Sequence, residues 1–481
     1  MRATWAIGGL DLHLDLPPGR PRRGLEDALR SAVTAGRLAP GTRLPATRTV
    51  AADLGIARNT VAEVYEQLAA EGWLTSRVGA GTWVAARATD PPTDAPGTGD
   101  PGASTAGRAV PTPVRPAAGD LRAGIPDAAA FPRREWAAAV RRAVLDSPAA
   151  ALGYPDPRGV PAGREALAGY LARTRGVRAA PDRVLLARGF GGLLAAACRA
   201  LAAAGATRVA VEEYGHARHR DVVAAAGLEV VPLPVDRDGA DVARLPGLGA
   251  DAVLLTPAHQ FPTGAALAPD RRLAVVRWAA AAGTLVLEDD YDGEFRFDRR
   301  AVGALQALAP EQVLYAGTAS KSVGPGLGLA WAVAPGRLVD ALARQTALLG
   351  GGPAAVDQLA LAAFVGAHDL DRSVRRLRQH YRGRRARVEA AVAERLPGCA
   401  VGGLPAGLHC LVELPPGTSE AAVVAAAARR GVRVEGLSTF AAPGASPGRG
   451  PAVVVGYGAP GTHAFDAVLD AAVAAIAEVV G

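Results

Sequence analysis

Residues 284–295 read TLVLEDDYDGEF, an apolar run that ends in a cluster of acidic residues. An apolar run without alternation predicts a strand that is covered on both faces, as in a parallel sheet. Two similar runs come earlier, TRVAVEE at 207–213 and DAVLLT at 251–256, and helical stretches such as 191–204 lie between the runs. This alternation predicts an α/β fold with a mostly parallel sheet.

The acidic cluster itself predicts a binding site, because ligands of open α/β sheets bind beyond the carboxyl ends of the strands. A carboxylate of this cluster could pair with a protonated pyridine nitrogen, and a tyrosine hydroxyl there could bond a phenolic oxygen of the same ring. A metal site and a solvated turn are the alternatives. No histidine or further acid stands at a familiar ligand spacing, so we expect no metal.

Lys321 follows about thirty residues later, within GTASKSVGPGLGLAW at 317–331. It is the only lysine, since the other 52 of the 53 cationic side chains are arginine. A lysine amine can lose its proton and condense with an aldehyde, whereas a guanidinium cannot. The plainer interpretation is a surface lysine without a role.

A third element lies upstream, where RGFGGLLAAACRAL at 188–201 places glycines at the start of a predicted helix. Free backbone N–H groups and the helix dipole at such a start attract a phosphate. A tight turn would explain the same glycines.

The overall composition limits the classes of protein to which the chain can belong. Of 481 residues, 49% are hydrophobic, and the net charge of +7 permits a polyanionic partner. The three cysteines have no ligand spacing, which suits a reducing compartment. No signal peptide or long apolar run stands out, so we expect a cytoplasmic protein without a membrane segment.

Residues 87–119 are rich in Pro, Gly, Ser, Thr and Asp and predict a linker. It divides a small unit at 1–86 from a large unit. We expect the large unit to comprise a sheet domain at 120–376 and a smaller α+β subdomain at 377–481. The basic run at 372–392 would open that subdomain as a solvated helix, with a second DNA surface as the alternative.

The small unit has the pattern of a winged helix-turn-helix. Apolar residues at helical spacing predict helices over 25–33, 47–54 and 58–71, and LTSRVGAGTWVA predicts two strands around a turn at 79–81. The second helix of such a motif enters the major groove with its first residues. Those residues are Arg58, Asn59 and Thr60, and Arg48 could hold a phosphate. A helical protein-interaction module is the alternative.

Residues 36–84 resemble the GntR-type winged helix-turn-helix over nearly its whole length. The resemblance implies that Arg48, Arg58, Asn59, Thr60 and the wing residue Gly79 lie on double-stranded DNA. Ala57 departs from the pattern, because the family usually places Ser or Thr there to cap the recognition helix.

The large unit resembles the fold type I aminotransferases, which depend on pyridoxal 5'-phosphate. The motifs are YPDPRG (154–159), VEEYGHARH (211–219), TPAHQFPTG (256–264), LEDDYDGEF and GTASKSVGPGLGLAW. With the GntR-like head, the whole chain resembles the MocR-type transcriptional regulators. The family implies a regulator that senses pyridoxal phosphate or an amino compound, a head-to-tail homodimer and a two-part operator.

The resemblance also implies residue roles. Lys321 would form the Schiff base with the cofactor, Asp289 would face the pyridine nitrogen, and Tyr291 would bond the phenolic oxygen. His216 would stack on the ring, and Arg218 would meet the carboxylate of an effector. Thr318, with the backbone of Phe190 and Gly191, would hold the phosphate, helped by Tyr154 from a second subunit.

Two positions depart from the family. Gly328 stands where the family carries an arginine for the cofactor phosphate, and Val454 stands where true aminotransferases clamp a substrate carboxylate with arginine. We therefore expect a sensor and not a working transaminase. The rivals are an active aminotransferase or lyase with an added DNA-binding head, and a large domain that binds no cofactor.

Overall fold

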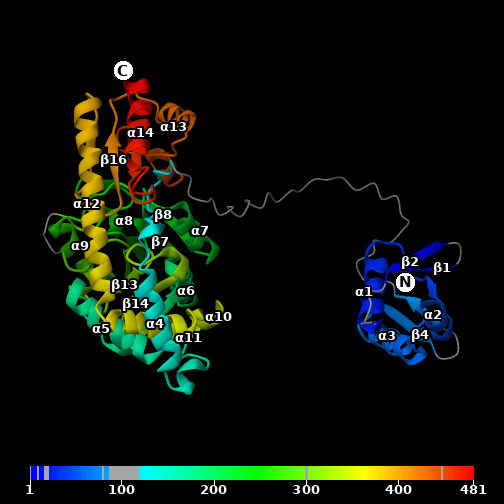
Figure 1. Cartoon of the computed structure of the whole chain (residues 1–481). Coiled ribbons are helices and arrows are strands. Elements are labelled where there is room, and N and C mark those ends of the chain that lie inside the picture. The colour runs from blue at the N-terminus through cyan, green and yellow to red at the C-terminus, as the bar shows by residue number, and fades with distance from the viewer. Residues whose placement is uncertain are drawn as a thin grey trace. The chain divides into compact units, whose positions relative to one another are not determined.

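The computed structural model describes residues 2–7, 10–15, 21–77, 81–85, 119–297, 302–445 and 448–481, with the backbone alone for residues 2–15. The chain forms two compact units, Met1–Pro111 and Thr112–Gly481 (Figure 1). Nearly all of the predicted linker lies outside the described residues. Each unit is therefore considered by itself.

The small unit is a winged helix-turn-helix, as the sequence predicts. Its wing strands β4 and β5 pair antiparallel, and the short β3 adds a third strand. An amino-terminal hairpin of β1 and β2 was not predicted. The elements are β1 (Arg2–Ile7), β2 (Leu10–Asp15), α1 (Pro21–Thr34), β3 (Arg43–Leu44), α2 (Thr47–Leu54), α3 (Arg58–Ala70), β4 (Leu74–Arg77) and β5 (Gly81–Val84).

Helical periodicity builds the core of this unit. Leu25 and Leu29 of α1 pack with Val61, Val64 and Leu68 of α3, and all five are buried. Apolar residues three or four positions apart share one helix face, so α1 and α3 bury their faces together. The opposite face of α3 is left for solvent.

A seven-stranded sheet forms the centre of the large unit, in the order β6-β14-β13-β12-β11-β7-β8. Only β14 runs antiparallel to its neighbours, so the predicted mostly parallel sheet is confirmed. The strands are β6 (Val184–Arg188), β7 (Arg208–Glu212), β8 (Glu229–Leu233), β11 (Ala252–Leu255), β12 (Leu285–Asp290), β13 (Val313–Thr318) and β14 (Leu329–Val333). A separate small hairpin pairs β9 (Val235–Asp236) with β10 (Gly239–Ala240).

Helices cover both faces of this sheet. On β12, Leu285 and Leu287 pack into one apolar cluster with α6 and α10, whereas Val286 packs into another with α9. Alternate residues of a strand point to opposite faces, which explains the continuous apolar run. The helices are α4 (Arg133–Leu145), α5 (Pro161–Arg175), α6 (Gly189–Ala203), α7 (Ala217–Ala225), α8 (Leu245–Leu248), α9 (Pro269–Ala282), α10 (Val339–Leu348) and α11 (Ala355–Gly366).

The carboxyl-terminal part has an antiparallel sheet in the order β15-β16-β18-β17, with α13 and α14 beside it (Figure 1). The proposed boundary at residue 377 lies inside the long helix α12, which continues past it without a break. The elements are α12 (Asp369–Arg395), β15 (Ala400–Gly402), β16 (His409–Glu413), α13 (Glu420–Arg429), β17 (Glu435–Gly436), β18 (Ala452–Gly456) and α14 (Phe465–Val480).

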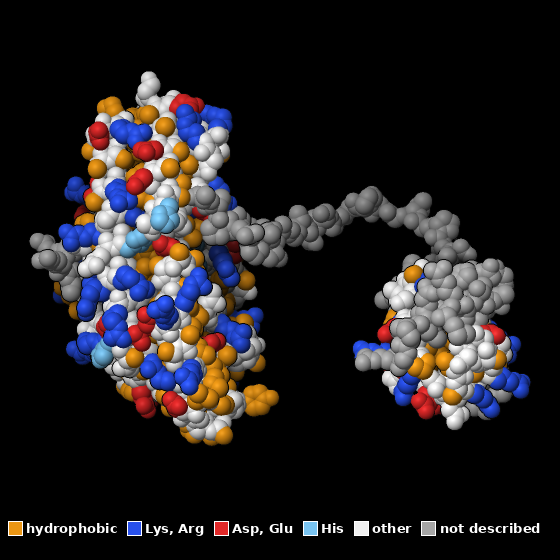
Figure 2. All heavy atoms as spheres, viewed as in Figure 1, with side chains coloured by type: hydrophobic (Ala, Val, Ile, Leu, Met, Phe, Trp, Pro, Cys, Tyr) orange, Lys and Arg blue, Asp and Glu red, His pale blue; other side chains and the backbone are white. Residues whose placement is uncertain are grey.

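The basic run at 372–392 lies within α12 and is only partly solvated. Arg375 is exposed, whereas Arg384 and Arg385 are buried and donate to the carbonyls of Tyr457 and Leu404, both at 2.8 Å. These two arginines therefore fasten α12 to neighbouring loops. Figure 2 shows arginines scattered over the visible face of the large unit rather than gathered in one patch. None of the described helices has the length and apolar character that crossing a bilayer requires.

Candidate functional site

A pocket of about 140 Å³ lies at the carboxyl ends of β12 and β13. It brings together six of the residues singled out from the sequence, although they are spread over more than 130 positions. They are Phe190, His216, Asp289, Tyr291, Thr318 and Lys321. Residues of the lining that the sequence did not single out include Gly124, Tyr214, His219, Phe261 and Ser320. The TPAHQFPTG motif contains Phe261, but nothing in it indicates an aromatic wall.

Lys321 follows β13, and its amine donates a hydrogen bond to the carbonyl of Gly124. Burial lowers the pKa of this amine, while the negative charges of Asp292 and Asp289 act in the opposite direction. A lowered pKa increases the fraction of the neutral amine, which is the nucleophilic form. The environment of Lys321 therefore suits attack on an aldehyde.

Asp289, the next-to-last residue of β12, lines the same pocket with a buried carboxylate. Its Oδ1 has no hydrogen-bond partner among the described residues. Burial is the main cause that raises the pKa of this carboxyl well above its usual value, and the neighbouring Asp290 and Asp292 add to it. An unpaired buried carboxylate is costly. A protonated ring nitrogen in the pocket would remove that cost, so Asp289 fits a pyridinium.

Tyr291 also lines the pocket, but its hydroxyl already has partners within the chain. The hydroxyl donates to the carbonyl of His259 at 3.0 Å and lies 3.2 Å from Nδ1 of the same residue. A phenol oxygen can accept a further hydrogen bond while it donates one. The geometry thus leaves Tyr291 able to accept a bond from a ligand.

His216 lies flat against Phe261, with ring centroids 3.9 Å apart and 19° between the planes. Burial is the main cause that lowers the pKa of this imidazole to about 3, and the nearby His219 and Lys321 contribute to the same shift. The ring is therefore neutral at physiological pH. A neutral flat ring at the pocket wall suits stacking on an aromatic ligand.

The start of α6 lies beside this pocket with Phe190 in its lining. Gly189 donates to the carbonyl of Gly328 at 2.7 Å, and the following N–H groups have no partner inside the helix. The guanidinium of Arg218 lies here too, 3.9 Å from the position that a Cβ on Gly191 would occupy. Arg218 has no hydrogen-bond or ion-pair partner among the side chains that the structure describes.

Thr318 ends β13 at the same side of the sheet. Its hydroxyl donates to the carbonyl of Leu329 at 3.1 Å, and the hydroxyls of Thr318 and Ser320 lie 2.8 Å apart. Tyr154, in contrast, is fully exposed and reaches no residue of the pocket within its own chain. Val454 is buried in β18 and shares an apolar cluster with Phe261.

The head presents its predicted residues at the start of α3. Arg58 and Asn59 are exposed, Thr60 is half-buried, and Arg48 is exposed in the first turn of α2. Ala57, at the helix boundary, makes no side-chain capping bond. Gly79 lies outside the described residues. Successive polar side chains at the start of an exposed helix match the reading edge of a helix-turn-helix.

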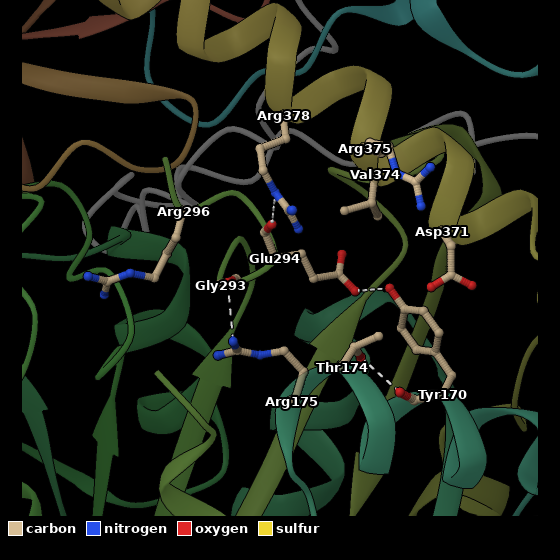
Figure 3. A pocket seen from close by; sticks show the side chains of 10 residues that line it. All are labelled: Tyr170, Thr174, Arg175, Gly293, Glu294, Arg296, Asp371, Val374, Arg375 and Arg378. Atoms are coloured by element: carbon tan, nitrogen blue, oxygen red, sulfur yellow. Dashed lines mark hydrogen bonds between the residues drawn. The ribbon is translucent and has the colours of Figure 1, made fainter. Parts of the chain in front are cut away.

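A second hollow, of about 270 Å³, lies between α5, α12 and the loop after β12. Figure 3 shows Arg175 beneath Gly293 and Tyr170 bonded to Glu294. Arg175 also holds Asp290 through two hydrogen bonds of 2.6 and 3.0 Å. Because Asp290 adjoins Asp289 in the chain, this ion pair fixes the end of the strand that carries the pocket.

Comparison with known proteins identifies both units. Residues 21–84 match the family described as bacterial regulatory proteins, gntR family, and residues 120–450 match aminotransferase class I and II. Among solved structures, a Pyrococcus horikoshii kynurenine aminotransferase matches with a TM-score of 0.67 and 21% identity, covering 75% of this chain and 90% of that chain. The fold is thus a DNA-binding head joined to a fold type I, aminotransferase-like domain, a class that depends on pyridoxal phosphate.

Relatives with both units are transcriptional regulators. The probable rhizopine catabolism regulatory protein MocR of Rhizobium meliloti is 34% identical over 80% of this chain and 79% of its own length. The pyridoxine biosynthesis transcriptional regulator PdxR of Corynebacterium glutamicum is 32% identical over 89% of this chain and 91% of its own length. The chain belongs to the MocR-type family of helix-turn-helix transcriptional regulators.

Proposed function

We propose that this regulator binds pyridoxal 5'-phosphate at Lys321. Its affinity for DNA changes when the cofactor, or an amino compound that reacts with the cofactor, occupies the pocket. The observation that carries the proposal is that Lys321 and Asp289 line one pocket, and that Asp289 Oδ1 has no hydrogen-bond partner among the described residues. The bound cofactor would supply an aldehyde for the amine and a pyridine nitrogen for the carboxylate.

The chain's own residues would hold and orient the ring. Asp289 would keep the ring nitrogen protonated, His216 would cover one face, and the Tyr291 hydroxyl would accept a hydrogen bond from the phenolic oxygen. Thr318 and the backbone of Phe190 and Gly191 receive the phosphate at the start of α6. One relative is named for pyridoxine biosynthesis, which supports pyridoxal phosphate itself as a signal.

Arg218 fits the phosphate better than an effector carboxylate. A guanidinium beside a helix amino terminus places two positive features together, which is unfavourable unless an anion lies between them. A phosphate monoester carries a charge of about −1.5 to −2 near neutral pH. Arg218 would then supply the cation that Gly328 does not provide. The carboxylate role remains as the alternative that the experiment below separates.

The pocket does not favour transamination of ordinary amino acids. Behind Phe261 of the pocket lining the surroundings are apolar, because Phe261 clusters with Val454, Phe440 and Leu411. That described cluster offers no cation to a substrate α-carboxylate, and burying an unpaired charge is costly. We therefore propose a sensor rather than an enzyme.

A homodimer would complete the site. Tyr154 is fully exposed, and other large apolar side chains on this unit are exposed as well, including Leu145, Leu152 and Leu348. A second copy would cover such side chains and let Tyr154 reach the partner's phosphate site. Two heads on the roughly 33-residue linker proposed at 87–119 would read a two-part operator. We place the dimer in the cytoplasm, with domains at 1–86, 120–376 and 377–481.

The test compares the parent with Lys321→Ala and Arg218→Gln, using pyridoxal phosphate and its phosphate-free analogue pyridoxal. The parent should capture both, with a visible absorption band that borohydride fixes to the chain, and Lys321→Ala should capture neither. Arg218→Gln should weaken binding of pyridoxal phosphate about tenfold or more and leave pyridoxal unaffected, because bonds to charged groups contribute about 1.5–3 kcal/mol.

Failure to capture either compound in the parent would overturn the cofactor proposal. Unchanged affinity for pyridoxal phosphate in Arg218→Gln would favour the alternative, in which Arg218 binds the carboxylate of an effector. Steady product formation with a panel of amino acids would favour the active aminotransferase.

A further inference from the structure

Three side chains of types that commonly bind metals, His259, Asp292 and His409, meet close to Tyr291. His259 lies in the loop after β11, Asp292 lies two residues beyond β12, and His409 begins β16. One ligand atom from each lies within 4.8 Å of the others. Only 2%, 2% and 0% of their respective surfaces are exposed. Sequence spacing gave no sign of this group, because its members come from three distant segments.

Most of the polar atoms in this group lack partners. His259 Nδ1 lies 2.8 Å from Asp292 Oδ2, and this contact is the one hydrogen bond that joins two of the three residues. His259 Nε2, Asp292 Oδ1 and both ring nitrogens of His409 have no hydrogen-bond partner among the described residues. No lysine or arginine forms a salt bridge with Asp292 in the part of the chain that the structure describes.

Leaving these buried polar atoms without partners costs free energy. A buried polar group without a hydrogen bond costs about 1–3 kcal/mol in proteins, and a buried charge costs more. Ring packing explains the place of His409 only in part: its ring lies 5.1 Å from that of Phe261 and 4.9 Å from that of His259. A phenylalanine would pack as well. A positive ion between the two buried imidazoles and the carboxylate would provide partners for these atoms.

We propose that His259, Asp292 and His409 bind a divalent metal ion. Two imidazoles and one carboxylate favour Zn²⁺ or a neighbouring transition ion such as Co²⁺ or Fe²⁺, whereas Mg²⁺ and Ca²⁺ prefer oxygen ligands throughout. The Tyr291 hydroxyl lies 3.2 Å from His259 Nδ1 and is therefore a neighbour of the proposed site. A water molecule would complete the coordination.

The distances allow such a site after a small closure. Ligands about 2.0–2.2 Å from a tetrahedral ion lie roughly 3.3–3.5 Å apart, so a separation of 4.8 Å has to shrink by roughly 1.3–1.5 Å. Gly407, with φ of +66°, permits the close approach, because a Cβ there would lie 2.2 Å from Asp292 Oδ2 and 2.5 Å from His259 Cε1.

A metal at this place would tie three segments together. It would join β16 of the carboxyl-terminal sheet to the loops that follow β11 and β12, which bear the cofactor pocket. Metal occupancy would therefore fix the carboxyl-terminal part against the pocket wall. This role does not depend on pyridoxal phosphate. The metal site and the proposed function can therefore be tested independently of each other.

The experiment uses the full chain, stripped with a chelator and then titrated with Zn²⁺ and, separately, with Co²⁺. We expect one Zn²⁺ per chain by elemental analysis. Co²⁺ should give visible ligand-field bands that Zn²⁺ abolishes. His409→Phe keeps the ring packing and removes both nitrogens, and it should weaken Zn²⁺ binding by 100-fold or more, since even outer-shell partners affect affinity 10–100-fold.

His463→Phe is the matched control, because His463 is exposed and far from the group in sequence; it should bind Zn²⁺ like the parent. Circular dichroism checks the fold of each variant, and Asp292→Asn replaces His409→Phe if the latter misfolds. A parent chain that takes up no Zn²⁺ at micromolar concentration overturns the proposal and leaves water as the occupant. Parent-like affinity in a folded His409→Phe or Asp292→Asn chain overturns it as well.

Discussion

The DNA-binding head and the pocket of the large unit differ in how their functional residues are placed. The described residues assigned to DNA lie between Arg48 and Thr60 on two adjacent helices, and Gly79 of the wing lies outside the described residues. The residues assigned to the cofactor come from β12, β13, α6 and the loop before α7, and most of their polar atoms are buried. A reading surface can thus be local and solvated, whereas a cofactor pocket requires distant segments and buried charges.

The largest expected effect concerns the buried charges on the pocket side. Arg175 and Asp290 form an ion pair with side-chain exposures of 5% and 1%. Arg175→Met should lower the free energy of unfolding of the large unit by about 3–5 kcal/mol, because it leaves a buried carboxylate uncompensated. Denaturant unfolding followed by the large unit's tryptophan signal measures the change.

Arg173→Met is the matched control on the same helix. Arg173 pairs with Asp371 at 2.8 Å, but the two side chains are 50% and 24% exposed. An exposed pair contributes about 0–1 kcal/mol, so this variant should unfold nearly like the parent. Equal losses in the two variants would mean that burial does not distinguish the two pairs.

The head should respond in affinity rather than stability. Arg58→Ala removes an exposed side chain at the start of α3 and should weaken specific operator binding by about 1–3 kcal/mol if it contacts a base. Arg23→Ala, an exposed position on α1, should reduce binding weakly and equally for all sequences. Fluorescence anisotropy with specific and scrambled duplexes measures both, and parent-like specificity in Arg58→Ala would remove it from the reading surface.

The smallest effect concerns the missing cap of α3. Ala57 has extended backbone, with φ of −64° and ψ of 138°, which is the conformation of a capping residue. Ala57→Ser should therefore stabilise the head by about 1 kcal/mol without altering which operator is read. Thermal unfolding of the head's transition is the measurement, and a loss of stability would show that another group already satisfies the helix end.

The same contrast explains what the sequence could predict. The helices 47–54 and 58–71 follow from periodicity and from glycines such as Gly55, which ends α2 with φ of +64°. The strands of the large unit follow from their apolar runs. The hairpin of β1 and β2 was not predicted, because a short alternating pattern next to charged residues is only a weak indication of a strand.

The site is predictable only where a motif marks it. Lys321, Asp289 and Tyr291 stand in motifs, and the structure brings them to one pocket. The position of Arg218 beside Gly191 and the meeting of His259 with His409 depend on sheet order and loop paths. No spacing within one segment encodes either contact. Family resemblance supplied the role of His216, which residue chemistry alone would not have indicated.

The central claim is that the cofactor pocket and the reading head are coupled. The most direct test is operator affinity with and without saturating pyridoxal phosphate, for the parent and for Lys321→Ala. We expect the parent's affinity to change about 5–150-fold, a coupling of about 1–3 kcal/mol, and the variant's affinity to stay constant. An identical response of the two proteins, or no response in the parent, would contradict the account.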